Sequence, residues 1–389
     1  MDPLTHGLLG AATGYVCLGR RLGWNAAAVG MTAGLLPDLD ILIRSDSDPL
    51  LKIEYHRHFT HSFPFSPIGA AIAALFWVCR EKHRANWKPI WLAALLAWWS
   101  HILCDSWTSY GTQFLVPFTN HRFSWDLMSI IDPIFTFTLL GGLVGARWAT
   151  GRARPSGTLS PSGGEGWGEG DSPSARKSSN QQFEANFSEP HHNGCDYQPK
   201  CILVTLAFGA FLLGLGGVQK YRAHAAQVQL AGSRGHPIER WEVMPTLGNN
   251  VLWRSIYLSD GKIHRDRIRL GVFSPSTYAT NDVLPIVSEQ TLTPEERQRD
   301  VTHNSFVRFQ WFADGWVARA PDDPAVIGDA RYSLSSDRFD PIWGIRFTPP
   351  AARTEIAWVN RSRNRRIDLG EMWSEIIGSH PDYRPIKVP

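Results

Sequence analysis

Long apolar stretches with few charges constrain this chain more than any other feature of its sequence. Six such segments occur, and five of them fall within the first 149 of its 389 residues. They are Gly7–Leu18, Leu22–Ile43, Phe65–Cys79, Pro89–Cys104, Ile130–Ala149 and Cys201–Val218. A helix needs about 20 apolar residues to cross a bilayer, and the first, third and fourth segments are short by that standard. We therefore expect an α-helical integral membrane bundle of about five to six apolar helices, followed by a β-rich soluble domain.

Composition divides the chain into four regions. Residues 1–149 are expected to form a membrane-embedded helical domain, and residues 201–222 a final transmembrane helix. Residues 150–200, with the run GTLSPSGGEGWGEGDSPSARKSSNQQ, predict a disordered linker because such a segment buries too little surface to fold. Residues 236–389 predict a β-rich soluble domain. Asp260-Gly261 predicts a hairpin between VLWRSIYL and IHRDRIRL, and Asp314-Gly315 predicts one between SFVRFQWF and WVARA.

The distribution of Arg and Lys predicts an orientation in the membrane. Most basic residues of the first 200 gather in alternate loops between the apolar segments, and the positive-inside rule places those loops in the cytoplasm. The amino terminus and the carboxy-terminal domain then lie on the non-cytoplasmic side. Lys220 and Arg222, just past the sixth segment, weakly favour the opposite orientation. The net charge of +3 is too small to suggest a nucleic-acid partner, so the expected partner is the lipid bilayer.

Side chains that bind metals recur in short motifs at the ends of the apolar segments. DPLTHG carries His6, LLPDLD carries Asp38 and Asp40, and WWSHILCDSW carries His101 and Asp105. Residues four apart, such as His101 and Asp105, share one face of a helix and could bind one ion. Carboxylates at the end of an apolar segment are costly and tend to be functional. The alternative at each motif is a polar group that closes a helix end.

A further motif, YHRHFTHS, places His56, His58 and His61 within six residues. Neutral imidazole is the commonest metal ligand, and zinc and iron sites favour it. The motif falls between two apolar segments, on the same predicted membrane face as Asp38 and Asp40. We therefore expect it to contribute metal ligands, and a solvated His-rich loop is the alternative.

Two other aspartates have a structural explanation. Asp2 and Asp132 each stand directly before a proline, which is the pattern of a helix N-cap followed by proline at the first helical position. Asp126 has neither this pattern nor a ligand spacing, so its role stays open.

Taken in order, these motifs resemble those of the membrane-bound metal-dependent hydrolases, the YdjM-like inner-membrane proteins of bacteria. THGLLG, PDLD, HRHFTHS and HILCDSWTSYGTQFLVPF carry the resemblance, over about residues 1–145. That family is similar in its His/Asp pattern to zinc-dependent phospholipases C and fungal single-strand zinc nucleases. The resemblance implies a multi-pass protein of the bacterial inner membrane that hydrolyses a phosphoester, with phospholipid as one candidate substrate. It implies metal ligands at His6, Asp38, His56, His61, His101 and Asp105, whereas His58 stands where the family has a small residue.

These residues predict a metal-dependent hydrolase. A metal gathered at one membrane face could lower the pKa of bound water and supply hydroxide near neutral pH. We expect a divalent metal, zinc in the first place, and the number of His and Asp also accommodates more than one ion. Asp38, Asp40 and Asp105 are the expected catalytic carboxylates. The alternative is a non-enzymatic metal-binding scaffold or a transporter, although a transporter would typically carry mid-span polar residues and inverted repeats.

Overall fold

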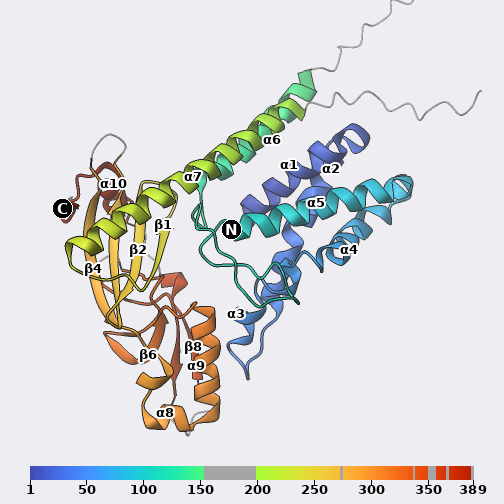
Figure 1. Cartoon of the computed structure of the whole chain (residues 1–389). Coiled ribbons are helices and arrows are strands. Elements are labelled where there is room, and N and C mark those ends of the chain that lie inside the picture. The colour runs from blue at the N-terminus through green and yellow to red at the C-terminus, as the bar shows by residue number, and fades with distance from the viewer. Residues whose placement is uncertain (153–198, 272–274, 336–337, 349–355, 365–367, 387–389) are drawn as a thin grey trace, which may run out of the picture.

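The computed structural model describes residues 1–152, 199–271, 275–335, 338–348, 356–364 and 368–386, in a helical half and a half built on two sheets (Figure 1). The expected disordered linker, apart from its first and last residues, lies outside the described residues and stays a prediction. The helices of the first half are α1 (Pro3–Leu22), α2 (Asn25–Leu35), α3 (Leu51–Tyr55), α4 (Ser66–Val78), α5 (Trp87–Ser106) and α6 (Pro133–Arg152). Short 3-10 helices lie between them: η1 (Leu36–Leu42), η2 (Phe59–His61) and η3 (Glu81–Asn86).

The expected bundle of about five to six membrane helices is wrong. Within the described residues, one helix is long and apolar enough to cross a membrane, namely α7 (Pro199–Ser233), with a mean hydropathy of 2.3 in its apolar stretch. A second span is counted only if Leu51–His61 and Ser66–Val78, which are bent by 81° at their break, form one. A multi-pass arrangement is therefore not supported.

The other apolar segments do not qualify as membrane-spanning helices. Turns interrupt some of them, and polar residues lower the mean hydropathy of others. Pro37 follows the end of α2, where proline disfavours a continuing helix, and the chain continues as η1. With 11 and 13 residues, α2 and α4 are about 16 and 20 Å long, well below the roughly 30 Å of a hydrocarbon core. The longer helices α1 and α5 carry polar side chains, among them His6, His101 and Asp105.

Close packing of α1 and α2 positions the polar motifs. A Cβ atom at Gly10 or Gly30 would collide with the backbone oxygen of the other residue, so the two helices can approach this closely only with glycine at both positions. The start of α1 is fixed by Asp2, whose carboxylate accepts a hydrogen bond from the Thr5 N–H at 3.0 Å, confirming the predicted N-cap. This pairing brings the end of α2 beside the first turns of α1, and α5 packs against both helices.

The second half contains two antiparallel sheets. Sheet 1 has the order β1 (Arg240–Pro245), β2 (Leu252–Ser259), β3 (Lys262–Arg269), β4 (Thr277–Pro285) and β9 (Arg384–Pro385). Sheet 2 has the order β5 (Val317–Ala320), β6 (Asp323–Asp329), β7 (Trp343–Phe347) and β8 (Ile356–Asn360). The helices are α8 (Pro294–Gln298), α9 (Asp300–Phe312) and α10 (Leu369–Ile377), with η4 (Glu289–Thr291) and η5 (Ser362–Asn364). The last part of α7 covers sheet 1, where Leu230 packs in one core with Trp253 and Ile268 (Figure 1).

One predicted hairpin is confirmed and the other is wrong. β2 and β3 pair through a two-residue turn in which Asp260 and Gly261 both have positive φ, 49° and 68°. The run SFVRFQWF, expected as a strand, belongs to the helix α9. Phe306, Phe309 and Phe312 recur every three residues and are all buried, which is the pattern of one helix face.

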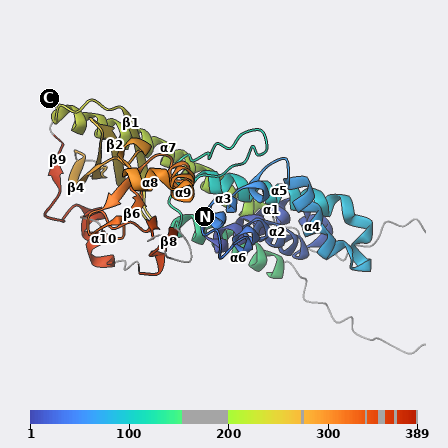
Figure 2. The same ribbon diagram turned by 90° about the horizontal axis from the view of Figure 1, so that it is seen from below.

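The two halves share a core and a set of ion pairs. Leu50 and Ile53, at the start of α3, are buried in the same cluster as Phe306 of α9. Figure 2 shows α3 next to α9. The Arg308 guanidinium donates hydrogen bonds to the Glu54 carboxylate at 2.6 Å and to Asp48 at 2.8 Å. The segment that leads into the His-rich motif is therefore held against the second half.

Candidate metal centre

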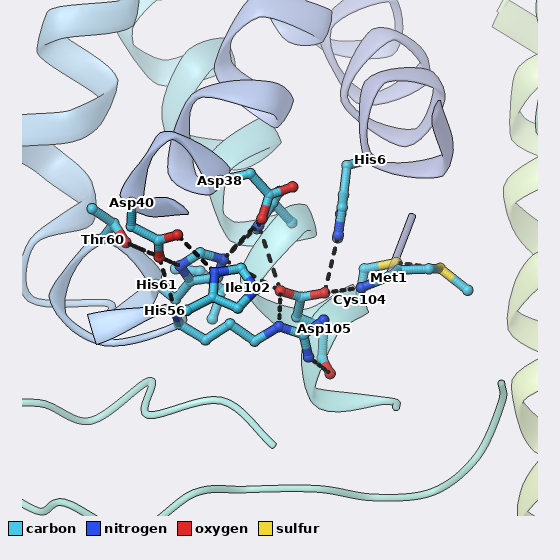
Figure 3. Close-up of polar contacts among 12 residues, drawn as sticks. Met1, His6, Asp38, Asp40, His56, Thr60, His61, Ile102, Cys104 and Asp105 are labelled. Atoms are coloured by element: carbon cyan, nitrogen blue, oxygen red, sulfur yellow. Dashed lines mark hydrogen bonds and ion pairs between the residues drawn. The ribbon is translucent and has the colours of Figure 1, made fainter. Parts of the chain in front are cut away.

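Four side chains from three separate motifs converge where α2 and α5 end. They are Asp38, His61, His101 and Asp105, and each offers a ligand atom within 4.8 Å of all the others. His61, His101 and Asp105 are buried, whereas the side chain of Asp38 is 24% exposed. Figure 3 shows Asp38, His61 and Asp105 facing a common point from different elements. The structure thus contains a cluster that could hold a metal ion.

The separations between these atoms suit a four-coordinate ion. His61 Nε2 lies 2.9 Å from His101 Nε2, 3.3 Å from Asp105 Oδ2 and 3.5 Å from Asp38 Oδ1. His101 Nε2 lies 3.6 Å from Asp105 Oδ2 and 3.7 Å from Asp38 Oδ1. Ligand atoms bound at zinc distances around a tetrahedral ion are about 3.4 Å from one another, which lies within this range.

Both imidazoles are oriented through their other nitrogen. His101 Nδ1 lies 2.7 Å from the backbone oxygen of Gly34, and His61 Nδ1 lies 3.1 Å from Asp40 Oδ2. These oxygens can only accept, so each Nδ1 carries a hydrogen and each Nε2 is the nitrogen that faces the cluster. When both rings are neutral, two lone pairs and two carboxylates face one point, and a bound cation would relieve their repulsion. Histidine ligands in metal sites are commonly oriented in this way.

Asp40 holds the His-rich loop and lies outside the four-atom cluster. Its Oδ2 accepts hydrogen bonds from the Arg57 N–H and the Thr60 hydroxyl, both at 2.9 Å, and its Oδ1 lies 2.8 Å from His56 Nδ1. Burial raises the pKa of this carboxyl, but hydrogen bonds with His56 and His61 outweigh burial and hold its pKa well below the usual range. Asp40 is thus an ionised residue that orients His61.

Asp38 is also ionised. Burial raises its pKa, but the hydrogen bond with His61 and the electrostatic effect of His101 outweigh burial and hold the pKa well below the usual range. It is the member of the cluster that solvent reaches most easily.

Asp105 presents its two oxygens to two different sets of nitrogen atoms. Oδ2 faces His61 and His101 and, although buried, has no hydrogen-bond partner in the described part of the chain. Oδ1 lies 3.0 Å from His6 Nε2 and pairs with the amino-terminal ammonium of Met1, on the opposite side of Asp105 in Figure 3. The His6 ring stacks on that of His101 with 3.7 Å between centroids. His6 therefore borders the cluster through Asp105.

Arg57 is a member of the site that the sequence did not identify. Its Nε lies 3.0 Å from Asp105 Oδ2, and its Nη1 donates to the Thr108 hydroxyl at 3.2 Å. Its φ of 64° is unusual for a residue other than glycine and directs its N–H toward Asp40. In the sequence, the only indication of this role was the position of Arg57 between His56 and His58 in YHRHFTHS.

The charges in this region are unbalanced. Asp38, Asp40 and Asp105 contribute three negative charges, and Arg57 and the amino-terminal ammonium of Met1, which both pair with Asp105, contribute two positive charges. With neutral imidazoles one negative charge is in excess. Burial lowers the pKa of His61, but hydrogen bonds with the three carboxylates outweigh burial and raise this pKa to about 10, so a cation is favoured at its Nε2, and a bound metal would take the place of that proton.

The remaining predicted residues lie elsewhere. His56 contacts Asp40 but is not one of the four converging donors, and His58 lines a separate pocket that Trp311 of α9 also borders. Asp132 accepts a hydrogen bond from the Phe135 N–H at 3.0 Å at the start of α6, which confirms its predicted N-cap role. Asp126 forms an ion pair with Lys220 of α7 at 2.8 Å, far along the chain from the His-rich motif.

Comparison with known proteins bears mainly on the helical half. Residues 1–160 match the model of the YdjM inner membrane protein family. The uncharacterized protein YfhP of Bacillus subtilis (strain 168) is 31% identical over 162 residues, which cover 39% of this chain. The match spans about half the length of that relative, 47%. No solved structure matches the chain. The family match supports the expected similarity to YdjM-like proteins and an inner-membrane location.

Proposed function

We propose that this protein is a membrane-bound metal-dependent hydrolase that cleaves a phosphoester or lipid-type substrate with a metal-activated water. The observation that carries the proposal is the convergence of four donor atoms, with both imidazole Nδ1 atoms already bonded to oxygens that can only accept. The three carboxylates of the site outnumber the two cations that pair with them, which also supports a bound cation. The match to an inner-membrane family supports a substrate found at or near the bilayer.

Asp38, His61, His101 and Asp105 would hold the ion, and zinc suits nitrogen and oxygen donors at these separations. A bound divalent cation would supply a water of lowered pKa and electrostatic stabilisation of a phosphoryl oxygen. Catalytic zinc sites keep one position for water or substrate. Because Asp38 is the most exposed of the four donors, the substrate would approach on its side.

The surrounding residues would position the ligands. Asp40 and the Gly34 carbonyl orient His61 and His101, and Arg57 keeps Asp105 ionised. A second ion between Asp105 Oδ1 and His6 would have to displace the amino-terminal ammonium of Met1, which pairs with that oxygen. Paired metals are a recurring arrangement for phosphoester cleavage.

The test combines metal content with hydrolysis. The full chain would be purified in detergent, its zinc measured by elemental analysis, and its activity assayed on a chromogenic phosphodiester, phospholipid vesicles and a carboxylic ester. We expect bound zinc and hydrolysis of a phosphoester that a chelator removes and zinc restores. Full zinc occupancy in both His61→Ala and His101→Ala would contradict the site. Zinc binding without hydrolysis of any substrate would instead favour the metal-binding scaffold.

The orientation of the second half is a separate part of the proposal. The 55 residues that precede α7 hold five Arg and Lys in total, whereas two, Lys220 and Arg222, stand directly after its apolar stretch. The positive-inside rule then favours a non-cytoplasmic location for the two sheets. Alkaline phosphatase or a fluorescent protein fused at the carboxyl end tests this, because the first is active outside the cytoplasm and the second inside it. A fluorescent fusion without phosphatase activity would reverse the orientation.

A further inference from the structure

A cavity of about 240 Å³ lies mainly in the second half, and Ser109 and Ser129 of the first half also line it. Four arginines line it: Arg254 and Arg265 extend from β2 and β3 of sheet 1, Arg267 from β3, and Arg331 follows β6 of sheet 2. Arg265, Arg267 and Arg331 are buried and Arg254 is half-buried. Carboxylates at and near α10 line it as well: Asp368, Glu371 and Glu375. The cavity is therefore a polar space in which the pairing of each arginine has to be examined in turn.

The register of sheet 1 places three of these cations on the same face. Arg254 stands directly opposite Arg267 across the β2–β3 ladder, and Arg265 stands opposite Ile256, two residues along. Directly opposed residues share a face of the sheet, as do residues two apart on one strand. Like charges in directly opposed positions destabilise a sheet. This arrangement is unfavourable unless anions balance the guanidinium groups.

Carboxylates balance two of the four arginines. Arg331 forms a bidentate ion pair with Asp329, in which Nε donates to Oδ1 at 3.0 Å and Nη2 donates to Oδ2 at 2.8 Å. Arg267 pairs with Glu375 of α10. These contacts close the cavity on the sides of β6 and α10.

Arg254 and Arg265 have no carboxylate partner within the described residues. Arg254 donates one hydrogen bond to the backbone oxygen of Arg331 at 3.0 Å, and its Nε is buried without a partner. The Arg265 guanidinium lies over the ring of Phe339 at 5.2 Å, and its Nη1 is also buried without a partner. The Tyr332 hydroxyl, from another residue that lines the cavity, is the third buried polar group without one.

Other acidic groups near the cavity form no ion pair with Arg254 or Arg265 in the described part of the chain. Asp368, which lines the cavity, caps the start of α10 and accepts hydrogen bonds from the Gly370 and Glu371 N–H groups. Asp282 acts on Arg265 electrostatically, and its carboxylate accepts a hydrogen bond from the Phe339 N–H. Glu242 stands opposite Ile256 across β1 and β2, and burial raises its pKa to about 8, so it is largely protonated at neutral pH. Burial and the neighbouring arginines lower the pKa of Arg265 to about 10, which leaves it charged at neutral pH.

We propose that this cavity binds a phosphate-type anion between the guanidinium groups of Arg254 and Arg265, with the Tyr332 hydroxyl as a further donor. Guanidinium groups bind phosphate oxygens through paired N–H donors, and such charge-assisted hydrogen bonds are strong. The anion is inorganic phosphate or the phosphate of a lipid headgroup, because both present the same oxygens. The proposal concerns a site separate from the metal centre and does not depend on hydrolysis.

The test measures phosphate binding by the full chain in detergent. Equilibrium dialysis with radiolabelled inorganic phosphate would compare the unmodified protein with Arg254→Gln and Arg265→Gln. Each substitution should weaken binding about 10-fold or more, because a hydrogen bond to a charged group contributes about 1.5–3 kcal/mol. Arg240→Gln is the matched control, because Arg240 lies on β1 of the same sheet and pairs with Asp314 outside the cavity.

Thermal unfolding gives a second readout that a purely structural role would not produce. Phosphate should raise the unfolding midpoint of the unmodified protein relative to chloride at equal ionic strength, and should raise that of Arg265→Gln less. Without phosphate, Arg265→Gln should match or exceed the unmodified midpoint, because it removes a buried charge without a partner. Unchanged phosphate binding in both variants would overturn the proposal, as would absence of both binding and a midpoint rise in the unmodified protein.

Lipid nanodiscs separate the two sources of phosphate. Nanodiscs of phosphatidylcholine with phosphatidylglycerol would be compared, as competitors of radiolabelled phosphate, with nanodiscs of phosphatidylcholine alone. Displacement only by the phosphatidylglycerol nanodiscs supports an anionic lipid headgroup as ligand. Saturable phosphate binding that neither nanodisc displaces supports a soluble phosphate.

Discussion

The metal centre and the arginine cavity are both buried and polar, but their charge imbalances are of opposite sign. At the metal centre three carboxylates outnumber the two cations that pair with them, the Arg57 guanidinium and the Met1 ammonium, whereas in the cavity Arg254 and Arg265 have no carboxylate partner among the described residues. The first is assembled from helix ends and a loop, and the second from neighbouring strands. The sign of an uncompensated buried charge thus indicates the kind of ligand that each half can bind.

The two halves are also in physical contact beside the metal centre. The Arg57 guanidinium lies over the ring of Tyr110, 4.7 Å from its centroid. Tyr110 in turn packs edge-on against Phe312 and Trp343 of the second half, with centroids 5.6 and 5.7 Å apart. A disturbance in the second half can therefore reach a residue that contacts Asp105.

The largest expected effect is the loss of a metal ligand. His101→Ala should weaken zinc binding by more than about 100-fold, because it removes a donor atom and leaves the carboxylates without their shared cation. Zinc per chain, measured by elemental analysis after dialysis against a weak chelator, gives the result. His58→Ala is the control, since His58 lines a separate pocket and should keep its zinc. Equal zinc loss in both variants would mean that His101 contributes no more to zinc binding than His58 does, which would contradict the proposed centre.

A smaller effect is expected where a residue orients a ligand without binding the metal. Asp40→Asn should weaken zinc binding by about 10–100-fold, because the amide no longer holds the His61 Nδ1–H as strongly. Competition with a zinc-sensitive dye measures the affinity. Asp38→Asn should show the larger loss, and the opposite order would show that Asp40, rather than Asp38, is the ligand.

In the second half, stability should depend on the protonation of Glu242. Its pKa in the folded protein, about 8, exceeds the usual 4.5 because burial outweighs the attraction of Arg331. A raised carboxyl pKa gives stability that is present below pH 4.5 and lost as pH rises through 8. Glu242→Gln should therefore be more stable than the unmodified protein at pH 8, by about 1–2 kcal/mol, with the difference shrinking toward pH 4.5.

Unfolding midpoints across this pH range measure the effect. Glu295→Gln, at an exposed position on α8, should show no such trend. Parallel pH profiles for Glu242→Gln and the unmodified protein would contradict the prediction.

The smallest expected effect tests the contact between the halves. Ile53→Val should lower stability by about 1 kcal/mol, because it removes one methylene from the core that α3 shares with α9. Limited proteolysis should also cut the loop around residues 56–61 faster. Ile41→Val, at a side chain that is 48% exposed, is the control and should change neither measurement. Equal proteolysis in both variants would mean that α3 does not depend on the second half.

Features that depend on a few adjacent residues could be predicted from the sequence. Asp2 and Asp132 form the expected N-caps, and Asp260-Gly261 forms the expected turn, because each is set by neighbours in the chain. All four cluster residues, Asp38, His61, His101 and Asp105, were among the predicted metal ligands. Their role as ligands remains a prediction.

Features that depend on tertiary geometry could not be predicted in this way. Apolar content alone did not distinguish a span from a short buried helix such as α4, whose 13 residues are interrupted on both sides. Arg57 acquires its role through a loop conformation that no motif encodes. Arg254 and Arg267 are opposed only because of the β2–β3 register, and 12 residues separate them in the sequence.

The uninterrupted length of α7 has a mechanical consequence. Its 35 residues make a rod of about 52 Å, and a bilayer core takes up roughly 30 Å, which leaves about 20 Å to carry sheet 1. The helix is continuous between the two parts, so sheet 1 moves with the apolar stretch when that stretch tilts. A change of about 20° would move the far end by roughly 7 Å. When α7 crosses a bilayer, membrane thickness therefore determines the orientation of sheet 1 relative to the lipid surface.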